Sequence, residues 1–125
     1  MTTALKSSDC NEWPPLSAEE IEVSKSAVPL WKVVGDSPPK LSREFKTKNF
    51  QCALDFINHA GKVAEERGHH PDLHIEGWNG VRVVIYSHGT NSLTQNDFNL
   101  AEAIDKDFSV AYNKKWLSEN PHVQP

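Results

Sequence analysis

The chain of 125 residues carries a formal charge of −4, with 24% charged and 38% hydrophobic residues. That length predicts one domain with a real core, and the acidic balance argues against nucleic acid as a direct partner. No apolar stretch approaches membrane-spanning length, and the first ten residues lack the apolar block of a secretory signal. Cys10 and Cys52 form neither a disulfide framework nor a CxxC motif. We therefore expect a reduced, cytoplasmic protein that does not bind membranes.

The chain divides into three parts by composition. Residues 1–15, which end in two prolines, predict a disordered lead-in, residues 16–117 a single domain, and residues 118–125 a tail. The domain opens with a complete helix start, because Ser17 suits the N-cap and Glu20 stands three residues later, where it closes a capping box. A first helix is therefore expected from Ser17 to just before Pro29.

Two short strands and a long helix are expected next. Residues 31–35 and 41–48 have the composition and alternation of strands. From Asn49 the apolar residues recur at three- and four-residue steps, which predicts a helix that ends near Gly68. The predicted buried stripe consists of Phe50, Ala53, Ile57, Ala60 and Ala64. His59 lies off this stripe and is expected at the surface.

A hairpin follows, and its loop length decides its register. A two-residue turn at Asn79-Gly80 would mix apolar and polar side chains on both faces. A three-residue loop, Trp78 to Gly80 with Gly80 left-handed, places the apolar set on one face and is therefore preferred. This apolar set consists of Leu73, Ile75, Val81, Val83 and Ile85. The same register predicts that His70 lies across from His88.

The last helix has its own start signal. Thr94 suits the N-cap and Asp97 the third helical position, and the apolar stripe predicts a helix to about Trp116. A second apolar line, Ala103, Val110 and Leu117, recurs every seven residues and indicates helix packing between subunits. The predicted order is α-β-β-α-β-β-α. The fold class is therefore α+β, a four-stranded antiparallel sheet with three helices packed on one face.

Four of the six histidines fall between Glu65 and Asp97. His69 and His70 lie at a helix-to-strand corner, because Gly68 suits a helix C-cap and Pro71 prevents the helix from resuming. Imidazoles gathered there could bind a metal or move protons near neutral pH, or they could be surface residues of a turn. The capping role of Asp97 fully explains that residue by itself.

The spacing of these residues resembles a known family. The signature is Glu65, then His69-His70-Pro71, Trp78, His88 and Asp97, and it is similar to that of the pterin-4a-carbinolamine dehydratases. The resemblance extends from Leu16 to the end of the last helix. It implies the α+β fold and dehydration of 4a-hydroxytetrahydrobiopterin to quinonoid dihydrobiopterin, with no cofactor and no metal. The chain departs from the pattern at Leu73, where many members carry an aromatic residue, and in one extra residue before Trp78.

The resemblance also implies roles for individual residues. His70 is the candidate acid, with His69 and His88 as base and partner, in an order that the resemblance leaves open. Glu65 and Asp97 would orient these imidazoles. The residues implied in pterin binding are Pro71, Trp78 and, through their backbone, Ser87, Gly89 and Thr90.

Two further expectations concern partners. Family members form homotetramers, as dimers of dimers, and some act as dimerisation cofactors of a homeodomain transcription factor. An interaction protein is therefore the alternative to an enzyme, and a histidine-ligated zinc protein is the third alternative.

Overall fold

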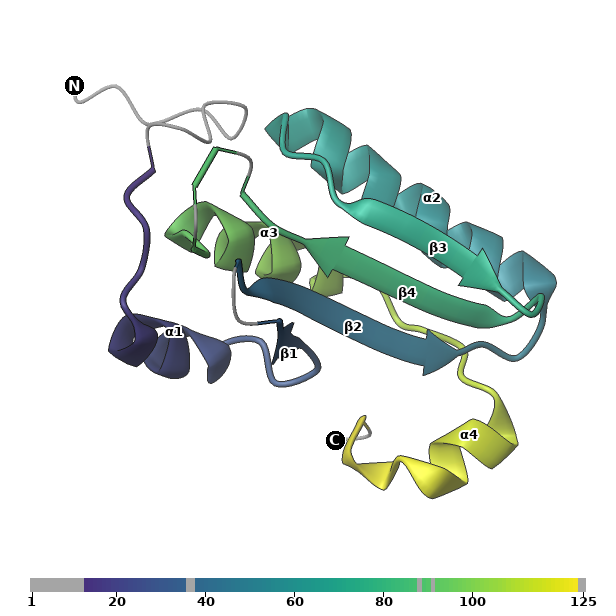
Figure 1. Ribbon diagram of the computed structural model, residues 1–125. Helices are drawn as coiled ribbons and strands as arrows, with labels where there is room; N and C mark the ends of the chain where they lie inside the picture. The colour runs from purple at the N-terminus through teal and green to yellow at the C-terminus, as the bar shows by residue number, and fades with distance from the viewer. Residues whose placement is uncertain (1–12, 36–37, 88, 91, 124–125) are drawn as a thin grey trace.

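The computed structural model describes residues 13–35, 38–87, 89–90 and 92–123, so most of the expected disordered lead-in lies outside the described residues. Four antiparallel strands form one sheet in the order β1-β2-β4-β3 (Figure 1). Along the chain, the elements are α1 (Ala18–Lys25), β1 (Lys32–Val34), β2 (Lys40–Lys46), α2 (Phe50–Arg67), β3 (Asp72–Glu76), β4 (Gly80–Ile85), α3 (Gln95–Asp105) and α4 (Lys114–Glu119), followed by a 3-10 turn at Pro121–Val123. The predicted fold class and the order of its seven elements are confirmed. The short α4 is an addition, and it continues two residues past residue 117, where the domain was expected to end.

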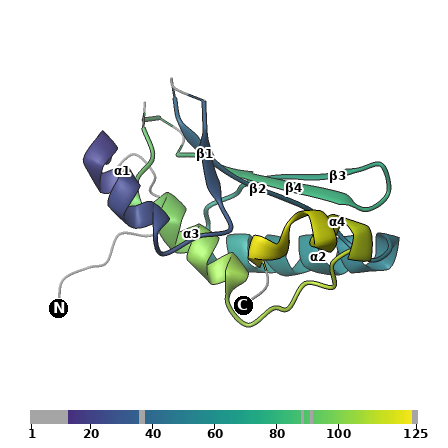
Figure 2. The ribbon, with the colours of Figure 1, turned by 90° about the horizontal axis from the view of Figure 1, so that it is seen from below.

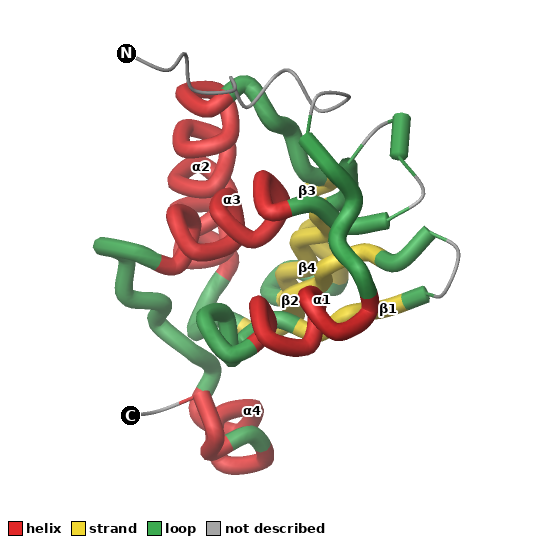
Figure 3. Tube along the Cα trace, turned by 90° about the vertical axis from the view of Figure 1, so that its left-hand side faces the viewer, coloured by secondary structure: helices red, strands yellow, loops and turns green. Residues whose placement is uncertain are grey.

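The helices all lie on one side of the sheet, as Figure 2 shows. Figure 1 looks onto the other, open face, and Figure 3 shows α3 lying beside α2. Strand residues alternate between the two faces, so one set enters the core beneath the sheet. Its fully buried members include Leu41, Phe45, Val81, Val83 and Ile85. In the described parts of the chain, no helix is long and apolar enough to cross a bilayer.

The local signals at the helix ends are confirmed. Ser17 and Glu20 form the expected capping box, and α2 ends at Gly68, which has a left-handed backbone with φ 66°. The buried stripe of α2 differs from the prediction in one respect. Phe50 is half exposed, and Phe56 supplies the buried aromatic ring instead. His59, expected at the surface, is only partly exposed.

The hairpin loop has three residues, as predicted, but it begins one residue earlier. Glu76 pairs with Gly80, and the left-handed residues are Gly77 and Trp78 rather than Gly80. The predicted apolar face is preserved. Each residue of β3 pairs with a β4 residue two positions away from the predicted partner, and residues two positions apart lie on the same face of a strand. The pairing of His70 with His88 is wrong, since β3 and β4 pair only from Asp72↔Val84 to Glu76↔Gly80. His88 itself lies outside the described residues.

The tip of this hairpin is fixed by contacts with a distant segment. The Asn79 side chain is buried and donates to the carbonyl of Thr47 at 2.8 Å, while the Thr47 amide donates to the Asn79 carbonyl at 2.9 Å. Gly80 is required by close approach, because a Cβ there would lie 2.8 Å from the carbonyl oxygen of Glu76. These two constraints select the observed register.

The prediction that the last helix continues to Trp116 is wrong, because α3 ends at Asp105. Asp107 then takes a left-handed conformation with φ 60°, and Phe108 stacks on His59 with ring centroids 4.5 Å apart. Packing of this turn on α2 therefore overrides the helical pattern. Val110 lies outside any helix, so Ala103, Val110 and Leu117 do not form a line on one helix.

The C-terminal end of α3 is tied to the sheet by Asp105. Its carboxylate accepts hydrogen bonds from Arg43 at 2.7 Å and from the indole of Trp31 at 2.9 Å. Burial raises the pKa of Asp105 above its usual value, although Arg43 and the hydrogen bonds act in the opposite direction. The second guanidinium nitrogen of Arg43 donates to the Tyr112 hydroxyl at 2.8 Å, which extends the network to the C-terminal segment.

That C-terminal segment pairs with the end of β2 that β1 does not reach. β1 pairs only with Lys40, Leu41 and Ser42 of β2. Beyond the other end of β2, Thr47 forms an isolated bridge with Tyr112. The flanking backbone bonds run from Asn113 to Lys46 and from Lys48 to Ala111, both at 2.9 Å. Residues 111–113 therefore form strand-like backbone hydrogen bonds with residues 46–48 at this edge.

A pair of glycine substitutions tests the hairpin geometry. Gly80→Ala should destabilise the protein by about 1–3 kcal/mol, because its Cβ would meet the Glu76 backbone. Gly61→Ala is the matched control: Gly61 lies inside α2 with open space around it, so alanine should stabilise by about 0.5–1 kcal/mol. Urea unfolding measures both, and equal effects of the same sign would contradict the observed close approach.

Asp105 gives a pH-dependent prediction. Because its pKa is raised in the folded state, its contribution to stability is complete below the ordinary aspartate pKa of about 3.9 and is lost as the pH rises through the raised value. Relative to Asp105→Asn, the wild-type protein should therefore lose stability as the pH rises from about 4. Urea unfolding of both proteins over the acid range measures this difference, and a difference that stays constant with pH would rule it out.

Candidate active site

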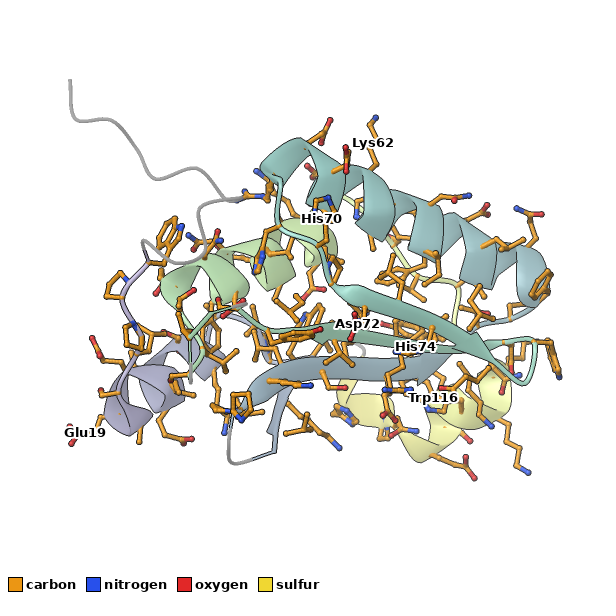
Figure 4. The ribbon with its side chains drawn as sticks, turned by 45° about the horizontal axis from the view of Figure 1, so that its top comes forward. Glu19, Lys62, His70, Asp72, His74 and Trp116 are labelled. Atoms are coloured by element: carbon orange, nitrogen blue, oxygen red, sulfur yellow. The ribbon has the colours of Figure 1, made fainter. Side chains whose placement is uncertain are left out.

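The site begins at the corner between α2 and β3. The left-handed Gly68 donates its amide to the carbonyls of Ala64 and Glu65, and the His69 amide donates to the Ala64 carbonyl at 3.2 Å. This hydrogen-bonded turn closes the helix. Pro71 then directs the chain into β3. Figure 4 shows His70 at this end of β3, with Asp72 and His74 following along the strand.

The corner sends the two adjacent imidazoles into different environments. His69 is 1% exposed, whereas the side chain of His70 is 63% exposed. One imidazole is therefore part of the core, and the other can meet a molecule from solution. Neighbouring histidines with such different surroundings are suited to different roles.

His69 is held by a buried carboxylate on α3. Its Nε2 lies 2.7 Å from Oδ1 of Asp97, and the Asp97 side chain is fully buried. An ionised carboxylate only accepts hydrogen bonds, so the Nε2–H of the imidazole donates. This contact fixes the ring orientation and the tautomer of His69.

The other oxygen of Asp97 performs the structural role that the sequence predicts. Asp97 is the third residue of α3, and its Oδ2 accepts the backbone N–H of Thr94, the N-cap, at 2.8 Å. Oδ2 also accepts the hydroxyl of Ser87 at 2.6 Å. Helix capping therefore explains only one carboxylate oxygen, and Oδ1 remains for His69.

His70 has its own acidic partner. Its Nε2 lies 2.8 Å from Oε1 of Glu65, whose side chain is 81% exposed. An exposed pair of this kind contributes little to stability, about 0–1 kcal/mol, so its consequence is orientation of the imidazole. The resemblance implies that Glu65 orients one of the imidazoles, and in the structure Glu65 pairs with His70.

The remaining predicted residues lie in different places. Pro71 is half-buried at the corner, Gly89 is exposed with φ 82°, and the Thr90 hydroxyl donates to the Ser92 carbonyl at 2.7 Å. Trp78 is exposed at the hairpin tip, at the opposite end of β3 from His70, so within one chain it does not join the site. His88 lies outside the described residues.

Thr94 is a site residue that sequence reasoning used only as a helix cap. Its hydroxyl lies 3.0 Å from the Ser87 hydroxyl and 3.4 Å from Oδ2 of Asp97, in a fully buried position. The signal that could have found this role was the capping box itself. No local pattern indicates that Ser87, in the segment after β4, turns inward to meet it.

The arrangement of these side chains limits the chemistry they can perform. The Ser87 hydroxyl donates to the carboxylate and not to an imidazole, so the group is not the nucleophile–base pair of covalent catalysis. Within the described residues, no three histidine, cysteine, aspartate or glutamate side chains are placed to hold a metal ion. The described part of the site consists of one buried, carboxylate-oriented imidazole and one exposed imidazole.

The chain is similar to known proteins over most of its length. The sequence model described as pterin 4 alpha carbinolamine dehydratase matches residues 14–107. A protein of Rubrobacter xylanophilus is 40% identical over 74% of this chain and 84% of its own length. The mitochondrial pterin-4-alpha-carbinolamine dehydratase 2 of Arabidopsis thaliana is 43% identical over 61% of this chain and 41% of its own. The crystal structure of a transcriptional coactivator/pterin dehydratase from Brucella melitensis is similar with a TM-score of 0.66 and 28% identity, covering 74% of this chain and 96% of that one.

Proposed function

Because the chain belongs to the pterin-4a-carbinolamine dehydratase family, we propose that it converts 4a-hydroxytetrahydrobiopterin to quinonoid dihydrobiopterin and water. The observation that carries this proposal is the pair of imidazoles at the α2–β3 corner. His69 is oriented by Asp97 and His70 by Glu65, so each has a defined ring orientation before a substrate arrives.

The reaction requires two proton movements and no redox change. The C4a–O bond of the substrate breaks, and the hydroxyl leaves as water once it has received a proton. The nitrogen N5 supplies the electron pair that forms the new C4a=N5 double bond and then loses its own proton. A general acid near the hydroxyl and a general base near N5 are therefore sufficient, and histidine titrates in the right range for both tasks.

The environments of the imidazoles support separate roles. His70 is the proposed acid at the hydroxyl, since it is exposed and can regain a proton from solvent after each turnover. His69 and His88 are proposed as base and partner. The Nε2–H of His69 is committed to Asp97, which would increase the capacity of its Nδ1 to accept a proton. Pro71, Gly89 and Thr90 remain the residues proposed to contact the pterin edge.

The likeness to the Brucella coactivator/dehydratase favours a second candidate, an interaction protein that acts as a dimerisation cofactor or coactivator. The homotetramer and the cytoplasmic location also stay predictions. The helical line expected to form the subunit contact is absent, because α3 ends at Asp105. An assembly would therefore need another surface of the chain.

Substitution of His70 tests the proposed acid. His70→Ala should lower kcat by roughly 10²–10⁴-fold, the usual contribution of general acid catalysis, with little effect on folding because the side chain is exposed. His122→Ala, in the exposed C-terminal turn, is the matched control and should leave kcat unchanged. The measurement is turnover of chemically generated 4a-hydroxytetrahydrobiopterin. Equal, slight effects of both substitutions would mean that the corner is only structural.

Removal of metals tests the zinc alternative. If the imidazoles transfer protons directly, the purified protein should retain its full rate in EDTA. Elemental analysis of the same sample gives the metal content. Stoichiometric zinc together with loss of activity on chelation would show that the imidazoles are metal ligands.

A further inference from the structure

We propose that Ser87 is a positioning residue, which acts through Asp97 to hold His69 in its working orientation and tautomer. This inference rests on the proposed dehydratase function and adds a side-chain role to Ser87, for which the family resemblance implies a backbone contact with the pterin. It is carried by the buried hydrogen-bond chain that links Ser87, Asp97 and His69.

The Ser87 hydroxyl already donates its hydrogen bond within the protein. A serine hydroxyl has one proton, and Ser87 donates it to Oδ2 of Asp97 in the shortest hydrogen bond of the group, at 2.6 Å. Ser87 is 5% exposed, and its hydroxyl contacts the side chains of Asp97 and Thr94. A hydrogen bond donated by the Ser87 hydroxyl to a pterin would require the contact with Asp97 to break.

Thr94 adds a third member to this series of hydrogen bonds. Because the Ser87 hydroxyl donates to Asp97, the Ser87 oxygen can accept a hydrogen bond from the Thr94 hydroxyl at 3.0 Å. Successive donation towards an anion strengthens each bond in the chain. Thr94 therefore supports Ser87, in addition to its backbone N–H bond to Asp97 at the start of α3.

These contacts fix the carboxylate as a rigid acceptor. An aspartate side chain can rotate about its Cβ–Cγ bond, where the energy profile is broad. Ser87 and the Thr94 amide hold Oδ2 from two directions, so Oδ1 is left pointing at Nε2 of His69. Loss of the Ser87 donor would allow the carboxylate to turn and would loosen the imidazole without removing it.

The place of Ser87 in the chain adds a second consequence. Ser87 lies two residues beyond the end of β4 and directly precedes His88 in the sequence. Its contact with Asp97 therefore anchors Ser87 to the first turn of α3. One hydroxyl thus connects α3, which carries Asp97, to the segment that leaves β4.

The test compares Ser87→Ala with Ser92→Ala. Ser92 lies in the same connection between β4 and α3, and its hydroxyl donates to the Leu16 carbonyl at 2.9 Å, away from Asp97. Ser87→Ala should lower kcat by about 10- to 100-fold, as expected for loss of a hydrogen bond to a charged group, with KM changed less than about twofold. Ser92→Ala should leave kcat, KM and the pH profile unchanged.

A further readout separates positioning from a general structural defect. The side-chain nitrogens of His69, followed by NMR, should show one Nε2–H tautomer in the wild type and a mixture or exchange broadening in Ser87→Ala. The NMR signal does not depend on turnover, so it tests the inference even if the wild type is not a dehydratase.

The outcomes distinguish the alternatives. A raised KM with unchanged kcat would assign Ser87 to the substrate and overturn the inference, as would an unchanged His69 spectrum in Ser87→Ala. If Ser87→Ala does not fold, Ser87→Cys preserves the side-chain shape with a weak donor. It should give an intermediate loss of kcat, and wild-type kcat in a folded Ser87→Cys protein would refute the proposal. Absence of any turnover by wild-type protein would count against the proposed function alone.

Discussion

The buried carboxylate of Asp97 is the interaction on which the rest of the site depends. A fully buried carboxylate is costly unless donors surround it, and here backbone, hydroxyl and imidazole donors all converge on it. The same group begins α3, closes the segment after β4 and orients His69. Structure and chemistry are therefore not separable at this position, because the helix start and the imidazole share one side chain.

The helix that carries Asp97 is tied at both ends by acidic residues. Asp97 joins its first turn to the α2–β3 corner, and Asp105 joins its last residue to Arg43 and Trp31. Burial raises the pKa of Asp105, so this carboxyl group becomes protonated at a higher pH than an ordinary aspartate. Side-chain contacts at both ends therefore connect this 11-residue helix to the sheet and to the α2–β3 corner.

Features set by neighbouring residues could be predicted from the sequence, whereas features set by distant contacts could not. The Ser17 cap and the Gly68 stop depend on a few adjacent residues, and both are confirmed. The observed hairpin register differs from the predicted one because the side chain of Asn79 donates to the carbonyl of Thr47, 32 residues away. The last helix was predicted too long because Phe108 leaves it to pack on His59.

The site shows the same division. The corner geometry of His69 and His70 followed from Gly68 and Pro71, but the contact between His69 and Asp97 spans 28 residues and entered only through the family resemblance. The inward turn of Ser87 had no local signal at all, because a serine after a strand is compatible with exposure or burial.

The C-terminal segment has a consequence for how chains meet one another in solution. An uncovered strand edge is a template for pairing with another polypeptide, and such pairing leads to aggregation. Residues 111–113 occupy that edge beyond β2, and Tyr112 secures them through Arg43. They lie past residue 107, where the match to the family ends. In a chain shortened to residue 107, this end of the β2 edge would lose its backbone partners in residues 111–113 and would be open to pairing with another polypeptide.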